Sequence, residues 1–236
     1  DIEFAVNGLL ARCQLSKGQA ADARRTIETL RTRFEAQGQT RFLPNMDALL
    51  CRIALHCDDP DSAEAWYRNK APRDPMHLNV MKRYQYLTQA MVEIMQNRPD
   101  AALLTLSPLE RYIQGCGRHI DGIHLNILCA LALYRKKDTK WRTRLTAALK
   151  TAAEYGFITT VSMYGAAVLP LLDKLNRDDD SKWYKRLMAD VRLQAAYYPR
   201  FLAPRMAAAE ELTPTELQIL HLICADKSNA EIAQIM

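Results

Sequence analysis

Glycine is scarce in this chain: only 8 of its 236 residues are glycine, and runs of β-branched residues are scarce as well. Strands are rich in β-branched residues, so the composition argues against a sheet and predicts an all-α fold. No glycine-rich loop of the kind that holds phosphates occurs, which excludes a P-loop type of nucleotide-hydrolysing site from this sequence.

Long hydrophobic runs are also missing. The longest apolar stretch, residues 127–133, is far shorter than the ~18 residues that span a bilayer, and no signal peptide opens the chain. We therefore expect a cytoplasmic protein without a membrane partner. Because the chain begins with Asp1 and enters a helical pattern almost at once, we also expect it to be an excised piece of a longer protein.

The cysteines form no CxxC pair, and most of them fall on apolar helical faces. Free buried thiols in a reducing compartment explain this pattern better than disulfides or zinc. The six positions are Cys13, Cys51, Cys57, Cys116, Cys129 and Cys224.

Charge of either sign is not concentrated. The formal net charge is +5, with 32 Lys and Arg against 27 Asp and Glu, and the basic residues are scattered. Such a balance permits contact with nucleic acid without indicating it.

Residues 1–197 contain an internal repeat that is visible at its turns. Successive turn signals lie about forty residues apart, and each has an apolar helical pattern on both sides. The signals are Gly18, Asp58–Pro60, Asn97–Pro99, Lys137–Asp138 and Asn176–Asp180. One helix pair cannot bury its apolar face without a neighbour, so the period predicts a right-handed, tetratricopeptide-like α-α superhelical solenoid of about five helix pairs.

Residues 212–236 form a separate motif, LTPTELQILHLICADKSNAEIAQIM. Thr213 can cap a helix that has Pro214 at its first position and Glu216 reaching back to the cap. Ser228 and Glu231 repeat this spacing and begin a second helix. Two such helices start a helix-turn-helix, whose third helix would follow Met236 and is absent here.

This motif resembles the four-helix DNA-binding domain of LuxR-type transcription regulators. The matching positions are Leu212, Thr213, Glu216, Ile219, Leu220, Leu222, Ala225, Ser228, Asn229, Glu231, Ile232 and Ala233. The chain departs from the pattern at Thr215, where the family has Arg, and at Asp226, where it has Gly. The resemblance places Thr213, Ser228 and Asn229 at the DNA backbone, where helix N-termini suit phosphates.

Segments 101–118 and 156–158 resemble the helical repeats of the large LuxR-type regulators related to the maltose-regulon activator. In that group an ATPase module precedes the repeats and the DNA-binding domain follows them. The resemblance implies repeats that sense a small effector or a protein partner, DNA binding by the complete terminal domain, and a homo-oligomer in the active state. Pro199 and Pro204 mark residues 198–211 as a linker, with Phe201 and Leu202 able to dock on the last repeat.

No residues suggest catalysis, and no cofactor motif occurs. His119, Asp121 and His124 invite a metal-site interpretation, but their spacing does not match the i, i+4 geometry of ligands on a helix. A helix N-terminus capped by Asp121 explains that carboxylate better.

Binding is the remaining function. The first helix of each pair usually lines the concave face of a solenoid, and polar residues on these helices are candidate contacts. The candidates are Asn7, Gln14, Arg52, Arg83, Asn126 and Tyr164, with Tyr84, Tyr86 and Tyr134 as a possible stacking platform. For each one, a solvent-facing or purely packing role is the alternative. For the whole chain, the alternative is an interaction scaffold without DNA binding, in which the terminal helices cap the solenoid.

Overall fold

The computed structural model describes residues 2–73, 78–175 and 181–204, together with Thr215, Gln218, Leu222 and Ile232; the side chain of Gln114 is not described. The chain divides into two compact units, residues 1–204 and 205–236. The candidate DNA contacts Thr213, Ser228 and Asn229 lie outside the described residues, so the account below concerns the first unit.

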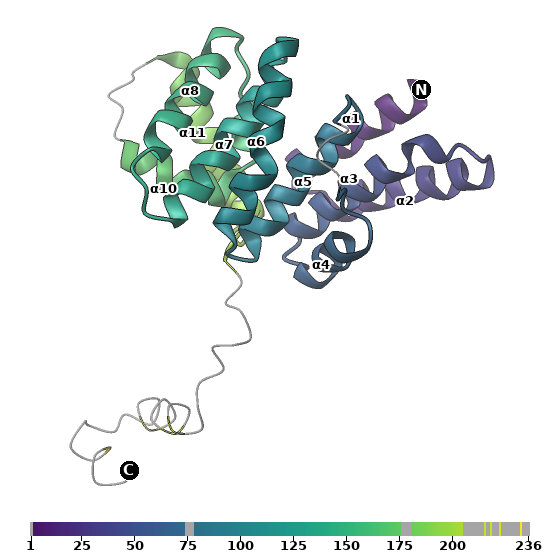
Figure 1. Cartoon of the computed structure of the whole chain (residues 1–236), viewed down its shortest axis with the longest axis horizontal. Coiled ribbons are helices and arrows are strands. Elements are labelled where there is room, and N and C mark those ends of the chain that lie inside the picture. Colours follow the sequence, from purple (N-terminus) through teal and green to yellow (C-terminus); the bar gives the residue numbers. More distant parts are fainter. Residues whose placement is uncertain are drawn as a thin grey trace. The chain divides into compact units, whose positions relative to one another are not determined.

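The first unit is built from helix pairs (Figure 1). Its described residues contain eleven α-helices, one 3-10 turn and no strand, which confirms the all-α prediction. The helices are α1 (Ile2–Ser16), α2 (Ala20–Ala36), α3 (Leu43–His56), α4 (Pro60–Asn69), α5 (Lys82–Met95), α6 (Pro99–Cys116), α7 (His119–Arg135), α8 (Trp141–Glu154), α9 (Thr159–Ser162), α10 (Gly165–Leu175) and α11 (Lys182–Tyr197), and the 3-10 turn is Thr40–Phe42.

Five pairs result, which is the expected number: α1/α2, α3/α4, α5/α6, α7/α8 and α10/α11, with the short α9 between the fourth and fifth pairs. The fifth turn signal, residues 176–180, lies outside the described residues. The first helices of successive pairs contact one another, and the second helices of the first three pairs also contact the next first helix. None of the helices in the described part of the chain has the length and apolar content that a bilayer-spanning segment requires.

The turns inside the first four pairs share one backbone geometry. In each turn one residue has a positive φ, and the next amide donates to the carbonyl five residues earlier, at 2.8–3.0 Å, as in a Schellman helix end. The residues with positive φ are Gly18, Asp58, Asn97 and Lys137. Only the first is glycine, so the repeat is maintained by turn geometry and not by one residue type.

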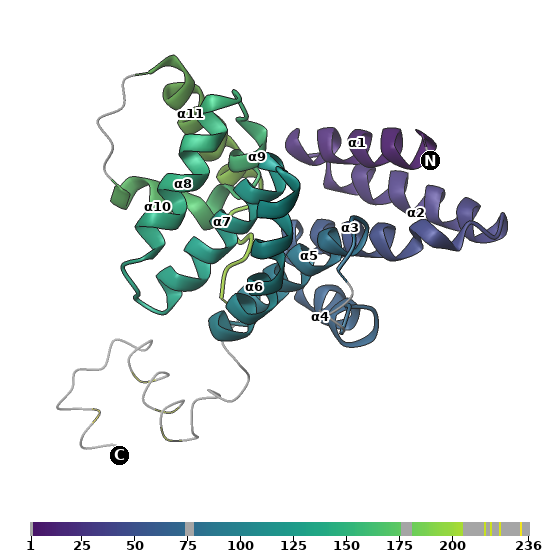
Figure 2. The same ribbon diagram turned by 45° about the horizontal axis from the view of Figure 1, so that its top comes forward.

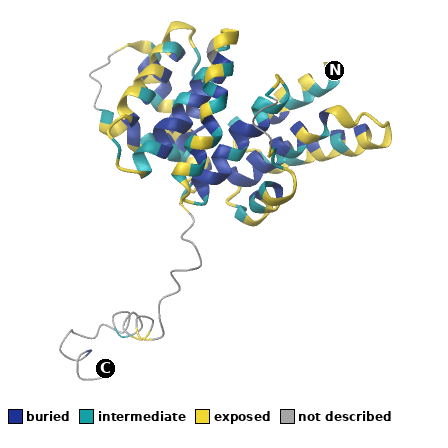
Figure 3. Cartoon of the chain, in the orientation of Figure 1, coloured by how far each residue is buried: buried dark blue, intermediate teal, exposed yellow. Residues whose placement is uncertain are grey.

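Burial differs between the two helices of a pair (Figure 3). Helices α3, α5 and α7 are buried on most of their circumference, because each lies between its own partner and the neighbouring first helices. The second helices bury one stripe and leave the opposite face exposed. In α2 that stripe is Ala23, Ile27, Leu30 and Phe34.

The end of the last helix returns to the first pair. The Gln194 side chain donates to the Ser16 carbonyl at 2.6 Å, and the Tyr198 hydroxyl donates to the Leu15 carbonyl at 2.7 Å. We call residues 194–202 the closing segment, because it joins elements that are about 180 residues apart in sequence. Figure 2 shows α11 and α1 within the same body of packed helices.

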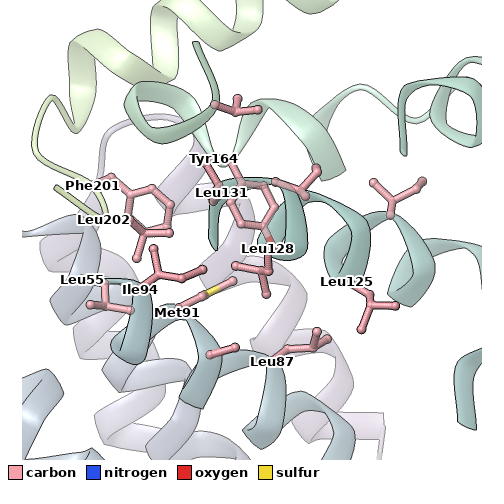
Figure 4. Close-up of a cluster of buried hydrophobic side chains, with 14 of the residues drawn as sticks. Leu55, Leu87, Met91, Ile94, Leu125, Leu128, Leu131, Tyr164, Phe201 and Leu202 are labelled. Atoms are coloured by element: carbon pink, nitrogen blue, oxygen red, sulfur yellow. The ribbon is translucent and has the colours of Figure 1, made fainter. Parts of the chain in front are cut away.

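The closing segment continues into the core. Phe201 and Leu202 are buried and lie among Leu55, Ile94 and Tyr164 (Figure 4). Arg135, at the end of α7, donates to the carbonyls of both Ile94 and Leu202.

These contacts change the expectation for the linker. The predicted linker began at residue 198, but residues 198–204 are part of the first compact unit, and residues 205–211 lie outside the described residues. Docking of Phe201 and Leu202 on the last repeat was also expected. Instead, these two residues pack at the ends of first helices from the second, third and fourth pairs, because those ends converge on a shared apolar cluster.

The cysteines also differ from expectation. Of the five that are described, Cys51 and Cys129 are buried, whereas Cys13, Cys57 and Cys116 are exposed. Burial raises the pKa of Cys129 to about 11, and it raises that of Cys51 further. The apolar-face pattern overestimated burial because the three exposed cysteines lie near helix ends, where fewer neighbouring helices cover the side chains.

Candidate ligand-binding pocket between the first helices

A cavity of about 580 Å³ lies between the first helices. Its walls come from α1, α3, α5 and α7, together with the turn before α7 and residues on either side of α9. Helical spacing places the lining side chains on one face of each helix, as for Leu49, Arg52 and His56 on α3. The charged and histidine lining residues are Arg12, Arg52, His56, Arg83, Arg118, His119, Asp121 and His124.

Arg52 forms the deepest positive charge of the cavity. Its residue is only 4% exposed, and its Nε donates to the Thr88 hydroxyl at 2.7 Å. Nη2 donates to the Tyr84 carbonyl at 3.1 Å, while the guanidinium lies 3.7 Å from the centre of the Tyr84 ring. No carboxylate among the described residues pairs with Arg52. A buried cation is therefore held by neutral partners alone.

Asp121 is the one carboxylate that lines the cavity, and it pairs with two arginines. Arg83 reaches it at 2.7 Å and Arg118 at 2.5 Å. The hydrogen bond to Asp121 raises the pKa of Arg118. The prediction that Asp121 caps a helix is wrong: α7 begins at His119 with Arg118 at the cap position, and Asp121 lies in the first turn. A carboxylate is still favourable there because of the helix dipole.

Two cavity arginines keep unused donor capacity. The Nε of Arg83 is buried and has no hydrogen-bond partner. Arg12 is exposed at the rim and makes no ion pair or side-chain hydrogen bond with any described residue. The arginines therefore present more donors to the cavity than the lining carboxylate can satisfy.

The buried histidines are neutral near pH 7. Burial lowers the pKa of His56 to about 4, although backbone carbonyls, including that of Arg52 at 2.7 Å, oppose the shift. Burial also lowers the pKa of His124 well below its usual value, and the positive charges of Arg52, Arg12 and Arg83 lower it further. The Nδ1 atom of His124 lies 3.0 Å from the Tyr164 hydroxyl.

The cavity and the closing segment share a wall. His56 lines the cavity, and its ring stacks on Phe201 at 4.0 Å between centroids, with Tyr198 edge-on at 4.9 Å. Leu15 also lines the cavity, and its carbonyl accepts the hydrogen bond from Tyr198. Residues that follow α11 therefore directly contact two residues that line the cavity.

Of the residues selected from the sequence, Arg52, Arg83 and Tyr84 line this cavity. The remaining candidates lie elsewhere. Asn7 donates to the Glu3 carbonyl of its own helix, and Gln14 accepts from Thr26 on α2.

Asn126 and Tyr134 face second helices. Asn126 accepts a hydrogen bond from Arg144 on α8, and Tyr134 packs edge-on against Trp141 while Lys174 donates to its hydroxyl. Tyr164 and Tyr86 are buried core residues. The proposed stacking platform is therefore not assembled, because its three tyrosines lie in different environments.

Sequence reasoning missed Arg12, His56 and Arg118 as cavity residues. It considered His119 and His124 only as metal ligands, and Asp121 as a metal ligand or a helix cap. His119 stacks on Tyr155 at 4.4 Å, and no group of three or more potential metal ligands occurs among the described residues. A usable signal was the i, i+4 pair Arg52 and His56 on an otherwise apolar face.

The stacked helix pairs and the partly enclosed cavity define the class: an α-α repeat protein with a candidate pocket among its first helices. Within that class, residues 1–178 match the family model described as the MalT-like TPR region, and the chain belongs to this family. No curated protein and no solved structure matches the chain.

Proposed function

We propose that this chain is the sensor part of a bacterial LuxR-type transcription regulator. Its repeats bind a small effector in the cavity, and binding controls the DNA-binding domain that begins at Leu212. The observation that carries this proposal is the shared wall: His56 contacts both the cavity and Phe201, which precedes the terminal motif by a short stretch of chain. The MalT-like family match supports a regulator-type repeat domain.

Control requires the effector to bind two states of the protein with different affinity. An effector that contacts Arg52 and His56 changes the packing of the His56 ring against Phe201. The closing segment would then rearrange, and with it the start of the chain that leads to residue 212. The cavity is partly enclosed and of small-molecule size, which favours an effector over a protein partner on this face.

For DNA, the proposal places Thr213, Ser228 and Asn229 on backbone phosphates, which position a protein without reading sequence. Base reading falls to the recognition helix of the complete domain. The described residues of this segment, Thr215, Gln218, Leu222 and Ile232, have a helical backbone. A cytoplasmic location and oligomerisation on activation belong to the same proposal.

The test uses the complete regulator, extended beyond Met236 through its third and fourth terminal helices. We expect it to select specific fragments from a genomic DNA library, and an Asn229→Ala variant to bind all of them more weakly. A metabolite screen by thermal shift identifies the effector, because a ligand at 100 times its Kd adds about 2.7 kcal/mol of stability.

Coupling between effector binding and DNA binding is tested with Phe201→Leu, which removes the ring that stacks on His56 while keeping an apolar side chain. This variant should still bind the effector but lose the effector-dependent change in DNA affinity. Leu193→Ala is the control, because Leu193 is 45% exposed on α11. Absence of specific DNA binding by the complete protein would defeat the proposal and favour a protein-interaction scaffold.

A further inference from the structure

We propose that the cavity between the first helices binds a small organic anion, whose acidic group is held by Arg12, Arg52 and Arg83. This inference rests on the proposed function, because it names the chemical class of the effector. Carboxylates and phosphates share the required chemistry, since both accept paired hydrogen bonds from a guanidinium.

The first support is the charge of the lining. Four guanidinium groups line the cavity, from Arg12, Arg52, Arg83 and Arg118, against the single carboxylate of Asp121. With the buried histidines neutral, the four arginines and one carboxylate give the lining a net charge of +3, and Arg12 and Arg52 have no carboxylate partner among the described residues. Such an excess in a partly enclosed site attracts anions and repels cations.

The second support is the cost of the buried arginines. Arg52 is buried without a carboxylate partner, and the Nε of Arg83 is buried without any partner. Buried charge and unused buried donors are unfavourable unless something compensates for them. An acidic group that reaches both side chains would compensate for both, because Arg52 and Arg83 line the same cavity.

The positive charges of the same arginines also act on His124. It is buried at the cavity floor, and after burial the largest causes that lower its pKa are the charges of Arg52, Arg12 and Arg83. Three arginines from three different helices therefore act together at one point. This agreement supports a single anion position over three unrelated surface charges.

The remaining lining fits an organic skeleton. Leu15, Leu49, Leu87, Ile120 and Phe157 contribute apolar walls. A volume of about 580 Å³ lies within the range of small-molecule sites and exceeds what an inorganic ion would fill. The expected ligand is therefore a metabolite-sized molecule with an acidic group at one end and carbon atoms against the apolar wall.

The test is isothermal titration of the present chain with three probes: glucose 6-phosphate, citrate and uncharged glucose. At least one anionic probe should bind saturably with a Kd below about 10 mM, and glucose should bind at least about tenfold more weakly. The two anionic arms separate a phosphate ligand from a carboxylate ligand.

Arg12→Gln is the diagnostic variant, because Arg12 is exposed and has no partner whose loss would unfold the chain. It should weaken anion binding by about tenfold without changing the melting temperature. Arg192→Gln on α11 removes the same charge from an exposed position outside the cavity, and its Kd should stay within about twofold of the parent value.

The proposal is overturned if neither anion binds up to about 10 mM, if glucose binds as tightly, or if Arg12→Gln leaves the Kd unchanged. Its failure differs from failure of the proposed function. Anion binding without any effect on DNA affinity in the complete regulator would contradict only the regulatory proposal. Control of DNA binding by an uncharged effector would contradict only this inference.

Discussion

First and second helices of the repeats bury very different side chains. Eight of the buried polar or charged residues lie on α3, α5 and α7: Asn45, Arg52, His56, Gln85, Thr88, Glu93, Asp121 and His124. Among the described residues, the second helices of the first four pairs bury no polar side chain. The second helices of the first four pairs therefore contribute hydrophobic packing to the core, whereas α3, α5 and α7 contribute packing together with the polar chemistry of the site.

The polar residues also connect one repeat to the next. Side-chain hydrogen bonds join Gln85 to Asn45 at 2.8 Å, Arg83 to Asp121 at 2.7 Å and His124 to Tyr164 at 3.0 Å. The partners are separated by 38–40 residues in sequence, about one repeat. Hydrogen bonds between polar side chains thus link successive repeats. Four predictions test the contrast between first and second helices.

The largest expected effect is at the closing segment that packs against the first helices. Phe201 is 2% exposed and stacks on His56. Phe201→Ala should lower the free energy of unfolding by about 3–5 kcal/mol through lost burial and a cavity. Urea denaturation measures this change. Leu193→Ala, on the exposed face of α11, should cost less than about 1 kcal/mol; equal losses would remove the distinction.

Acid should act through the first helices. The pKa of His56 is near 6.5 when unfolded and about 4 in the fold, so the unfolded chain binds more protons between these values. The free energy of unfolding should therefore fall by about 3 kcal/mol as pH decreases from 6.5 to 4, and His124 acts in the same direction.

Denaturant midpoints measured across this pH range provide the test. His56→Gln should flatten the profile. Leu193→Ala, which removes no titratable group, should leave the shape of the profile unchanged. A profile that is identical in the parent and His56→Gln proteins would contradict the assignment.

The third prediction compares two polar contacts. Thr88→Val on α5 removes the hydroxyl that accepts from the buried Arg52 guanidinium, and should cost about 2 kcal/mol. Glu110→Gln on α6 weakens a partly exposed pair with Arg144 and should cost about 0.5 kcal/mol. Thermal or urea unfolding measures the loss of stability in both variants. A larger loss for Glu110→Gln than for Thr88→Val would contradict the predicted difference between first and second helices.

The smallest effect is expected at a turn that belongs to neither helix. Lys137 has a φ of 58°, a region costly for a residue with a side chain, and its side chain is exposed. Lys137→Gly should raise the free energy of unfolding by about 0.5–1 kcal/mol. Lys140→Gly, where φ is −59°, should give no gain in the same unfolding measurement.

Much of the fold could be predicted from the sequence, because helix periodicity and turn spacing are local. The turns at Gly18, Asp58, Asn97 and Lys137 lie where the repeat placed them. The site was predictable only in part. Arg52 and Arg83, selected as possible concave-face contacts, line the cavity, whereas Asn126, selected on the same ground, accepts a hydrogen bond from Arg144 on α8.

The sequence by itself determined the helix pairs, their period and the MalT-like repeat class, since each depends on residues within about forty positions. Only the tertiary structure decided which polar residues meet. Asp121 joins two arginines, one of them 38 residues earlier, and Tyr198 reaches the carbonyl of Leu15 across 183 residues. The physical reason is that helical period fixes the face on which a side chain lies, whereas superhelical packing fixes what that face meets.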